Sequence, residues 1–346
     1  MADSASAGRY SVVERVAALR TVDYSQLAAR RVVVVGCGAL GSAVAMHLVR
    51  GGVGNVRVID RDVVEMRNLS HQVLYTEQDA ALGRLKAEAA ATHLRGLNTG
   101  CVVDGVVADY APGNAVQLTA GADLLVDGAD NLETKLLLND VAVATATPLV
   151  YAGCAGTEGS VLAVLPGVTH CLRCLWPTPG AAAARMTCET RGLLPATAAT
   201  VAALQSTEAL KLLLGLGRDS LCGLLRIDVW DGVLRRVPLP TFSAGPRPCP
   251  ACGDRDFGYL RGDHRTTARE LCGDDTVLLS GPAGATDLGR LQQRHRANTS
   301  LRARPECVQI EIDGCRIVAF SSGRTLIYGA GGLNRAKALY ARHVIG

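Results

Sequence analysis

Residues 32–45 read VVVVGCGALGSAVA, and this stretch decides the fold of the 346-residue chain. An apolar, β-branched run followed by glycines at 36, 38 and 41 is typical of a strand that turns tightly into a helix. The first amides of such a helix have no partner within it, so they are free to bind phosphate. The stretch therefore predicts a nucleotide site at the turn and the first helical residues: Gly36, Gly38, Ala39, Leu40 and Gly41.

A carboxylate suited to a ribose follows this turn. Asp60 ends the strand-like run NVRVID and lies 19 positions after Gly41. In dinucleotide-binding folds, an acidic residue at about this separation accepts hydrogen bonds from the ribose hydroxyls. NAD, FAD and ATP all bind to this kind of turn, so other motifs in the sequence are needed to distinguish among these ligands.

Composition narrows the class of protein. The chain has 36 basic and 32 acidic residues without a run of like charge, which argues against nucleic acid as the main partner and still suits an acidic protein partner. Neither the N-terminal MADSASAGRY nor any later stretch has the apolar length of an export signal or a membrane span. We therefore expect a cytoplasmic protein that does not associate with membranes.

Strand-like and helix-like stretches alternate along the first part of the chain. The strand-like runs lie at about 31–35, 55–60, 101–107, 123–127, 148–153 and 160–165, and the helix-like stretches at about 39–51, 83–97 and 131–146. This alternation predicts an α/β fold with a doubly wound, mainly parallel, Rossmann-like sheet. A long buried helix near 196–214 and two short strands near 223–230 and 233–237 follow.

The pattern changes after residue 255. Helix-like stretches near 286–296 and 333–342 are there interspersed with short strand-like runs: TVLLSG, VQIEID, RIVAFSS and TLIYG. We therefore divide the chain into a large domain at 1–255 and a small α+β extension at 256–346.

Four of the twelve cysteines form two pairs with metal-ligand spacing. Cys171 and Cys174 lie in HCLRCLW, and Cys249 and Cys252 lie in RPCPACG. A two-residue gap lets neighbouring thiolates bind one tetrahedral metal, so the pairs predict a structural zinc that ties together segments 75 positions apart. Two unrelated turns and a redox dithiol are the alternatives. The proline and glycine around the second pair favour zinc, and neither pair opens a helix of a thioredoxin-like unit.

The motifs after the second strand resemble those of the ThiF/MoeB/HesA family, the bacterial relatives of ubiquitin-activating enzymes. The resemblance extends from about residue 9 to 253, and the tail from Val318 resembles the C-terminal extension of some bacterial ThiF-type proteins. A nicotinamide dehydrogenase is disfavoured, because the hydride-transfer residues it needs are not found. The motifs that carry the resemblance are IDRDVVEMRNLSHQ, LGRLKAEAA, VDGADNLETKLLLND, CLRCLWP and TCETRGLLPATAATVAALQSTEALKLLLG.

The resemblance implies a reaction and its partners. Members of this family use ATP and Mg²⁺ to adenylate the C-terminal Gly-Gly carboxylate of a ubiquitin-like sulfur-carrier protein, for cofactor or metabolite biosynthesis such as that of thiamine or molybdopterin. It also implies a homodimer in which the N-terminal segment reaches the other subunit. The main rival is a carrier-binding scaffold without turnover, and an NAD-dependent oxidoreductase is a distant third.

The resemblance also implies nucleotide-binding residues beyond the glycine turn: Asp60, Asp62, Asn68, Lys86, Asp130 and Asn131. Asp60 would accept hydrogen bonds from the ribose hydroxyls, and Asn68 would position the triphosphate of ATP. Lys86 would neutralise the phosphates as pyrophosphate leaves, and Asp130 would hold Mg²⁺. Each has a local alternative: Asp60 as a loop cap, Lys86 as a solvated helix residue, and Asp130 as the N-cap of the next helix.

Cys188, in AAARMTCETRG, matches the family's loop cysteine. In some members this residue links covalently to the carrier, whereas an incidental thiol is the alternative. Arg191 or Arg185, if close, would lower its pKa and favour the reactive thiolate. Cys37 and Cys154 lie in apolar runs, so we expect them in the core or in a pocket wall.

Two positions depart from the family pattern. Val12 in RYSVVERV and His71 in NLSHQ stand where members commonly have arginines that hold the triphosphate. Arg15 or Arg9 is the alternative donor for the first position. A neutral imidazole lacks the two-pronged donor of arginine, although we expect an adjacent phosphate to raise the pKa of His71. Either adenylation is weaker and more dependent on pH, or the chain binds its partner without catalysis.

Overall fold

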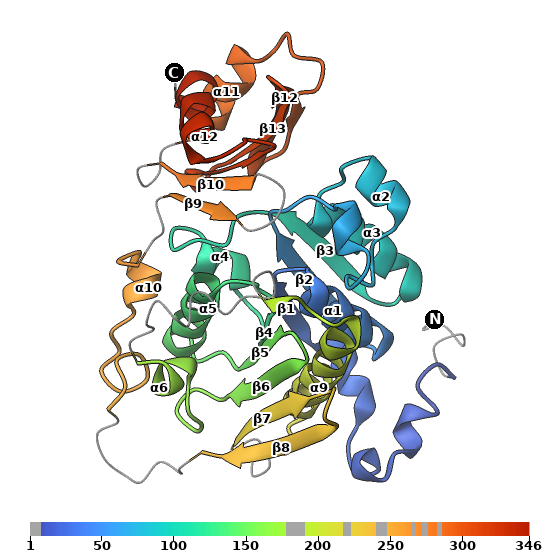
Figure 1. The fold of residues 1–346 in the computed structure, drawn as a ribbon. Helices are drawn as coiled ribbons and strands as arrows, with labels where there is room; N and C mark the ends of the chain where they lie inside the picture. The colour runs from blue at the N-terminus through green and yellow to red at the C-terminus, as the bar shows by residue number, and fades with distance from the viewer. Residues whose placement is uncertain are drawn as a thin grey trace.

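The computed structural model describes residues 8–177, 191–216, 223–239, 248–264, 268–271, 276–281 and 286–345. Within these residues the chain forms an eight-stranded sheet and a separate six-stranded sheet (Figure 1). No helix in the described ranges has the length and hydropathy needed to cross a bilayer.

The large sheet is built around the predicted turn. Its strands are β1 Arg31–Val35, β2 Asn55–Asp60, β3 Val102–Val107, β4 Leu124–Asp127, β5 Leu149–Ala155, β6 Glu158–Val164, β7 Gly223–Asp228 and β8 Val233–Pro238. In space they follow the order β3-β2-β1-β4-β5-β6-β7-β8, with parallel pairings from β3 to β5 and antiparallel pairings from β5 to β8. This confirms the mainly parallel sheet. The order reverses between β1 and β4, and ligands of doubly wound sheets bind beside such a reversal.

Helices cover both faces of the large sheet, as predicted. The helices α1 Ala39–Arg50, α3 Lys86–Leu97 and α9 Pro195–Leu213 pack on one face, and α5 Leu132–Ala144 covers the other (Figure 1). The sequence pattern misses the short helices, because one or two turns contain too few residues to display a 3.6-residue period. These are α2 Glu77–Ala81, α4 Ala115–Thr119, α6 Leu172–Leu175, α10 Gly258–Arg261 and the 3-10 turns η1 Val13–Arg15, η2 Ala17–Leu19, η3 Tyr24–Ala29 and η4 Met66–Asn68.

The C-terminal extension is an antiparallel sheet with two helices. Its strands are β9 Ala268–Leu271, β10 Thr276–Ser280, β11 Arg302–Ala303, β12 Cys307–Ile312, β13 Cys315–Phe320 and β14 Arg324–Tyr328, in the spatial order β11-β12-β13-β14-β10-β9. The helices α11 Leu288–Arg294 and α12 Leu333–Tyr340 pack on one face, and a π-helical turn, η6 Ala341–Ile345, ends the described chain. Both helices and four of the six strands fall where the sequence predicts them.

The other face of the small sheet packs against the large domain. Side chains alternate between the two faces of a strand, so Val277 and Leu279 face the helices whereas Leu278 faces the large domain. Phe320, which is fully buried, lies in the same interdomain cluster as Val63 and Leu85. The extension is therefore docked on the loops that follow the parallel strands (Figure 1).

Candidate functional site

The glycine turn joins β1 to α1 and approaches the loop after β4 closely. Gly36 has a positive φ of 87°, and a Cβ there would lie 2.5 Å from the carbonyl oxygen of Gly128. A Cβ at Gly41 would lie 1.9 Å from the carbonyl oxygen of Gly36. Each of these glycines is therefore required by its neighbours' backbone.

The start of α1 leaves more space for a ligand than the glycine turn, which is crowded by backbone atoms. Among the described residues, a Cβ at Gly38 would meet only Gln72 Nε2, at 3.8 Å. Ala39 and Leu40 form the first turn of α1, and the Leu40 side chain is buried in the core, which leaves the backbone amides to face a ligand. The buried Gln72 Oε1 has no hydrogen-bond partner within the described ranges. An unpaired amide oxygen beside helix amides fits a polar ligand at this position.

Asp60 joins the end of β2 to the glycine turn. Its carboxylate accepts a hydrogen bond from the Cys37 amide at 2.6 Å and another from the Asp62 amide at 2.7 Å. Burial raises the pKa of Asp60 to about 6, the Asp62 carboxylate adds to the rise, and Lys86 opposes it. Asp60 is thus a loop cap, as the local alternative proposed, and each oxygen keeps a further lone pair for a ribose hydroxyl.

Lys86 begins α3 and faces the acidic residues of the neighbouring loops. The side chain is buried, and its Nζ lies 3.5 Å from Asp62 Oδ2. Burial alone would lower the pKa of Lys86, but the carboxylates of Asp62, Asp60, Asp130 and Glu65 outweigh burial and raise it. The alternative of a solvated helix residue is therefore wrong: Lys86 is a charged group held within an acidic cluster.

The loop after β4 presents Asp130 beside the N-terminus of α5. The N-cap of α5 is Asn131, whose Oδ1 accepts from the Thr134 amide at 2.9 Å. Asn131 Nδ2 also donates to Asp130 Oδ1 at 3.0 Å. The alternative in which Asp130 caps the helix is wrong, because the neighbouring asparagine has that role. The structure brings Asp130 to the same cluster as Lys86.

Asn68 and His71 lie in the loop after β2. Asn68 Oδ1 accepts from the Glu65 amide at 3.2 Å, so this side chain stabilises the turn η4. His71 Nδ1 lies 2.8 Å from Ser70 Oγ. Burial lowers the pKa of His71, and the nearby positive charges of Lys86 and Arg67 lower it further. The protein itself thus disfavours the imidazolium form of His71. The rise in its pKa expected from the sequence therefore depends on bound phosphate.

Two charged pairs near the ends of the parallel strands are not predicted from the sequence. Arg61 directly follows Asp60 and pairs with the buried Asp109 at 2.5 Å. Lys135 Nζ donates to Asp127 Oδ2 at 2.9 Å beneath the loop after β4. Charged residues directly after a buried strand, as in the IDRD stretch, were the available signal for Arg61.

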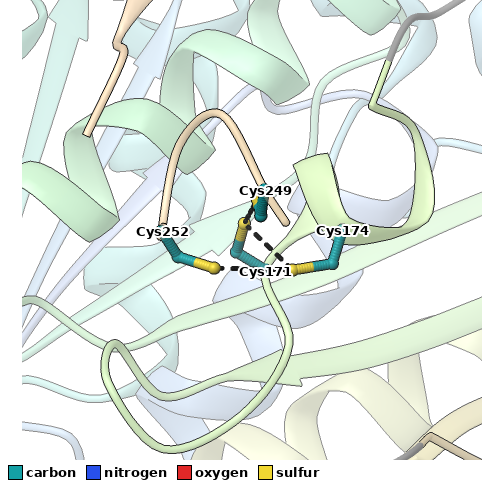
Figure 2. Close-up of side chains that lie close together, drawn as sticks. All are labelled: Cys171, Cys174, Cys249 and Cys252. Atoms are coloured by element: carbon teal, nitrogen blue, oxygen red, sulfur yellow. Dashed lines mark hydrogen bonds between the residues drawn. The ribbon is translucent and has the colours of Figure 1, made fainter. Parts of the chain in front are cut away.

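The four paired cysteines converge in the structure (Figure 2). The Sγ atom of Cys171 lies 3.9 Å from that of Cys174 and 3.6 Å from that of Cys249, and Cys174 lies 3.4 Å from Cys252. Four thiolates around one zinc at about 2.3 Å would lie about 3.8 Å apart, whereas a disulfide requires about 2 Å. The predicted convergence is confirmed, and the four donors fit a tetrahedral zinc.

The cysteine cluster ties the segment before the extension to α5. Cys249 is buried in the same apolar cluster as Cys171 and Leu138 of α5. Asp140, also on α5, accepts from the Tyr259 amide at 3.0 Å. Burial raises the pKa of Asp140 to about 6. A metal here would therefore hold the chain that leads into the extension.

Comparison with known proteins identifies the family. A sequence model of the ThiF family matches residues 12–251. The chain belongs to the ThiF family. The sulfur carrier protein ThiS adenylyltransferase of Bacillus subtilis is 38% identical over 342 residues, which cover 97% of this chain and 99% of that protein. The similarity to a ThiF-family relative thus includes the C-terminal extension.

Further relatives agree with this assignment. The sulfur carrier protein adenylyltransferase of Thermus thermophilus is 38% identical over 228 residues, covering 64% of this chain and 82% of that protein. The crystal structure of E. coli MccB matches with a TM-score of 0.62 and 22% identity, covering 72% of this chain and 74% of that one. The ThiF-family chain therefore shares the fold of MccB.

Arg9 of this ThiF-family chain lies away from Lys86. Arg9 Nη1 donates to the carbonyl oxygen of Leu97 at 3.0 Å, at the opposite end of α3 from Lys86. The 12 residues of α3 separate its ends by about 17 Å. Arg15 is exposed, as is Val12. Arg9 is thus engaged elsewhere and does not replace the missing arginine in its own subunit.

The remaining cysteine predictions divide into two groups. Cys188 and Arg185 lie outside the described residues, and Arg191 pairs with Glu158 at 3.0 Å. Cys37 is buried, and burial followed by the charge of Asp60 raises the pKa of its thiol to about 12. Cys154 is half-buried. The predicted core position of Cys37 is confirmed, and its raised pKa disfavours the thiolate.

Proposed function

We propose that this ThiF-family chain uses ATP to adenylate the C-terminal Gly-Gly carboxylate of a ubiquitin-like sulfur-carrier protein. The observation that carries the proposal is the buried Lys86, which faces three aspartates beside the start of α1. The near full-length similarity to a sulfur carrier protein ThiS adenylyltransferase supports the same reaction. Because the reaction consumes ATP, the proposal places the protein in the cytoplasm.

The proposed chemistry follows from charge placement. A carboxylate oxygen of the carrier attacks the α-phosphorus of ATP, and the bond from that phosphorus to the β-phosphate oxygen breaks. The amides that begin α1 would bind phosphate oxygens, and Lys86 would stabilise the charge that develops on pyrophosphate. Asp60 would orient the ribose. Asp130 would hold Mg²⁺, which supplies further charge neutralisation when bound.

Two further assignments belong to this proposal. The four clustered cysteines would hold a structural zinc, because their spacing suits that ion. We also place the boundary between the adenylation domain and the extension at 255/256, between the cysteine cluster and the small sheet. A homodimer would let the N-terminal segment of one subunit reach the phosphate side of the other.

A carrier-binding scaffold is the second candidate, favoured by Val12 and His71 at the two arginine positions. Carrier-dependent exchange of labelled pyrophosphate into ATP separates the two. The enzyme should catalyse exchange with a carrier that ends in Gly-Gly and not with one that lacks the last glycine. Carrier binding without exchange would support the scaffold.

Cys188 is the proposed site of a covalent link to the carrier. The Cys188 thiolate would attack the carbonyl carbon of the carrier's acyl-adenylate, forming a thioester as AMP leaves. Because adenylation itself uses the ATP site, Cys188→Ser should keep pyrophosphate exchange and lose this thioester adduct. Mass spectrometry of the enzyme with carrier and ATP measures the adduct. Loss of both activities would indicate a structural role, and persistence of the adduct would indicate another cysteine.

A further inference from the structure

An ion network joins the extension to the edge of the candidate nucleotide site. Arg324, on β14, is buried, and its Nη1 lies 3.3 Å from Asp109 Oδ1. Its Nη2 donates to Glu133 in the first turn of α5. Asp109 is buried after β3 and also accepts from Arg61. One carboxylate of the large domain is therefore shared by two guanidinium groups from distant parts of the chain.

The network ends at residues of the nucleotide site. Arg61 separates Asp60 from Asp62 in sequence, and its Nε lies 3.7 Å from Asp62 Oδ1. Glu133 lies two positions after Asn131, the N-cap of α5. Arg324 thus contacts the start of α5 directly, through Glu133, and the loop after β2 indirectly, through Asp109 and Arg61. These two segments carry the acidic residues around Lys86.

Apolar packing fixes the extension against the same loops. Val63 and Leu85 pair in an isolated bridge, and the Lys86 amide donates to the Asp62 carbonyl oxygen at 2.8 Å. Val63 and Leu85 share an apolar cluster with Phe320 of the extension. The short bridge that carries Asp62 and Lys86 is therefore covered by the small sheet.

Electrostatics make the network sensitive to the loss of one partner. Burial would raise the pKa of Asp109, but Arg324 and Arg61 outweigh burial and lower it. A buried carboxylate that loses one of two cations keeps a larger uncompensated charge, and the remaining cation moves to compensate. In this structure the remaining cation is Arg61, on the loop that carries Asp60 and Asp62.

We propose that Arg324 is a positioning residue for nucleotide binding, which holds Arg61 and the start of α5 in place through Asp109 and Glu133. The inference rests on the proposed function, because it assumes that the cluster around Lys86 binds MgATP. It assigns the extension a part in the ATP site that the adenylation reaction alone does not require.

Simple docking of the extension is the competing explanation, and the chain offers a matched control. Arg304 of the extension forms a two-pronged ion pair with Glu88 of α3, with Nη2 2.9 Å from Oε2. This pair joins the same two parts of the chain without contacting Asp109. Arg304→Gln therefore removes an interdomain guanidinium and leaves the network intact.

The test is the Kd for MgATP, measured by calorimetry without carrier for the full-length parent, R324Q, D109N, the double variant and R304Q. We expect R324Q to raise Kd about tenfold and R304Q to change it by less than about twofold. The double variant should bind no more than about twofold more weakly than R324Q, because both changes break one network. Melting temperatures identify variants that fail to fold.

Three results would overturn the inference: an unchanged Kd in R324Q, an equal rise in R304Q, or additive effects of R324Q and D109N. If R324Q does not fold, R324K replaces it, since lysine keeps the charge but does not reach both carboxylates, and we expect a rise of about threefold. An unchanged Kd for MgATP in R324K would then overturn the inference. A parent that binds MgATP without carrier-dependent exchange contradicts the proposed function alone, whereas a parent that does not bind MgATP contradicts both.

Discussion

Lys86 retains its charge because carboxylates surround it. Its pKa is raised, so the ammonium stays protonated well above neutrality and does not itself make the reaction sensitive to pH near 7. Asp60 differs, because its pKa is raised to about 6. As pH falls through this value, Asp60 takes up a proton and loses acceptor strength, so MgATP binding should weaken on the acidic side.

His71 should produce the opposite limb of the pH profile. Its pKa is lowered by the protein, and the imidazolium that stabilises phosphate is lost as pH rises. The bound triphosphate opposes this lowering by favouring the charged imidazole, so exchange by the parent should decline as pH rises through neutrality. H71R should flatten that decline and increase the rate at pH 8 by up to about tenfold, because arginine keeps its charge and its two-pronged donor.

The measurement for His71 is the rate of pyrophosphate exchange against pH with carrier saturating. H71Q is the matched control: it should be slow and lack the alkaline decline. Weakening below about pH 6 should remain in H71R, since it arises from Asp60. An H71R variant no faster than the parent at pH 8 would mean that residue 71 points away from the phosphates.

At the scale of elements, the cysteine cluster connects α6 to the loop before α10. Each segment is too short to be stable alone, and binding of a metal to both supplies folding free energy. The spacing of the cysteines predicts this junction without any knowledge of the fold. It does not predict the buried Asp140, which joins α5 to the amides of α10.

Cys249→Ser should release the metal and loosen the extension. We expect one zinc per chain in the purified parent, close to none in the variant, and a lower melting temperature, because three thiolates bind zinc more weakly than four. Metal analysis and thermal unfolding measure the two effects. Cys154→Ser, which changes a thiol outside the cluster, should keep the zinc, and a parent purified without zinc would refute the assignment.

At the scale of the whole molecule, the extension and the large domain share a small apolar core. Phe320 is fully buried there beside Val63 and Leu85. Phe320→Ala should lower the free energy of unfolding by about 3 kcal/mol, through lost burial and the cavity that remains. Urea unfolding measures the loss, with the exposed Val102→Ala as control. Equal stability of the two variants would contradict a shared core.

The sequence predicts contacts that repeat or cluster locally and misses those that join distant segments. The β-branched run and the glycines determine β1, α1 and the glycine turn between them, and the order of the motifs along the chain predicts that Lys86 and Asp130 belong to one site. The network of Arg61, Asp109 and Arg324 was not predictable in this way, because each residue resembles an ordinary surface charge in its own segment. Only the docking of the small sheet places Arg324 beside Asp109.

Carrier-dependent pyrophosphate exchange tests the central claim most directly. With MgATP and a ubiquitin-like carrier ending in Gly-Gly, the parent should incorporate labelled pyrophosphate into ATP. Lys86→Ala should lower the rate about a hundredfold or more, because a charge that stabilises the leaving pyrophosphate is lost. The exposed Lys337→Ala should leave the rate unchanged. If the parent binds the carrier but shows no exchange above the Lys86→Ala variant, the chain is a scaffold and the proposed reaction is wrong.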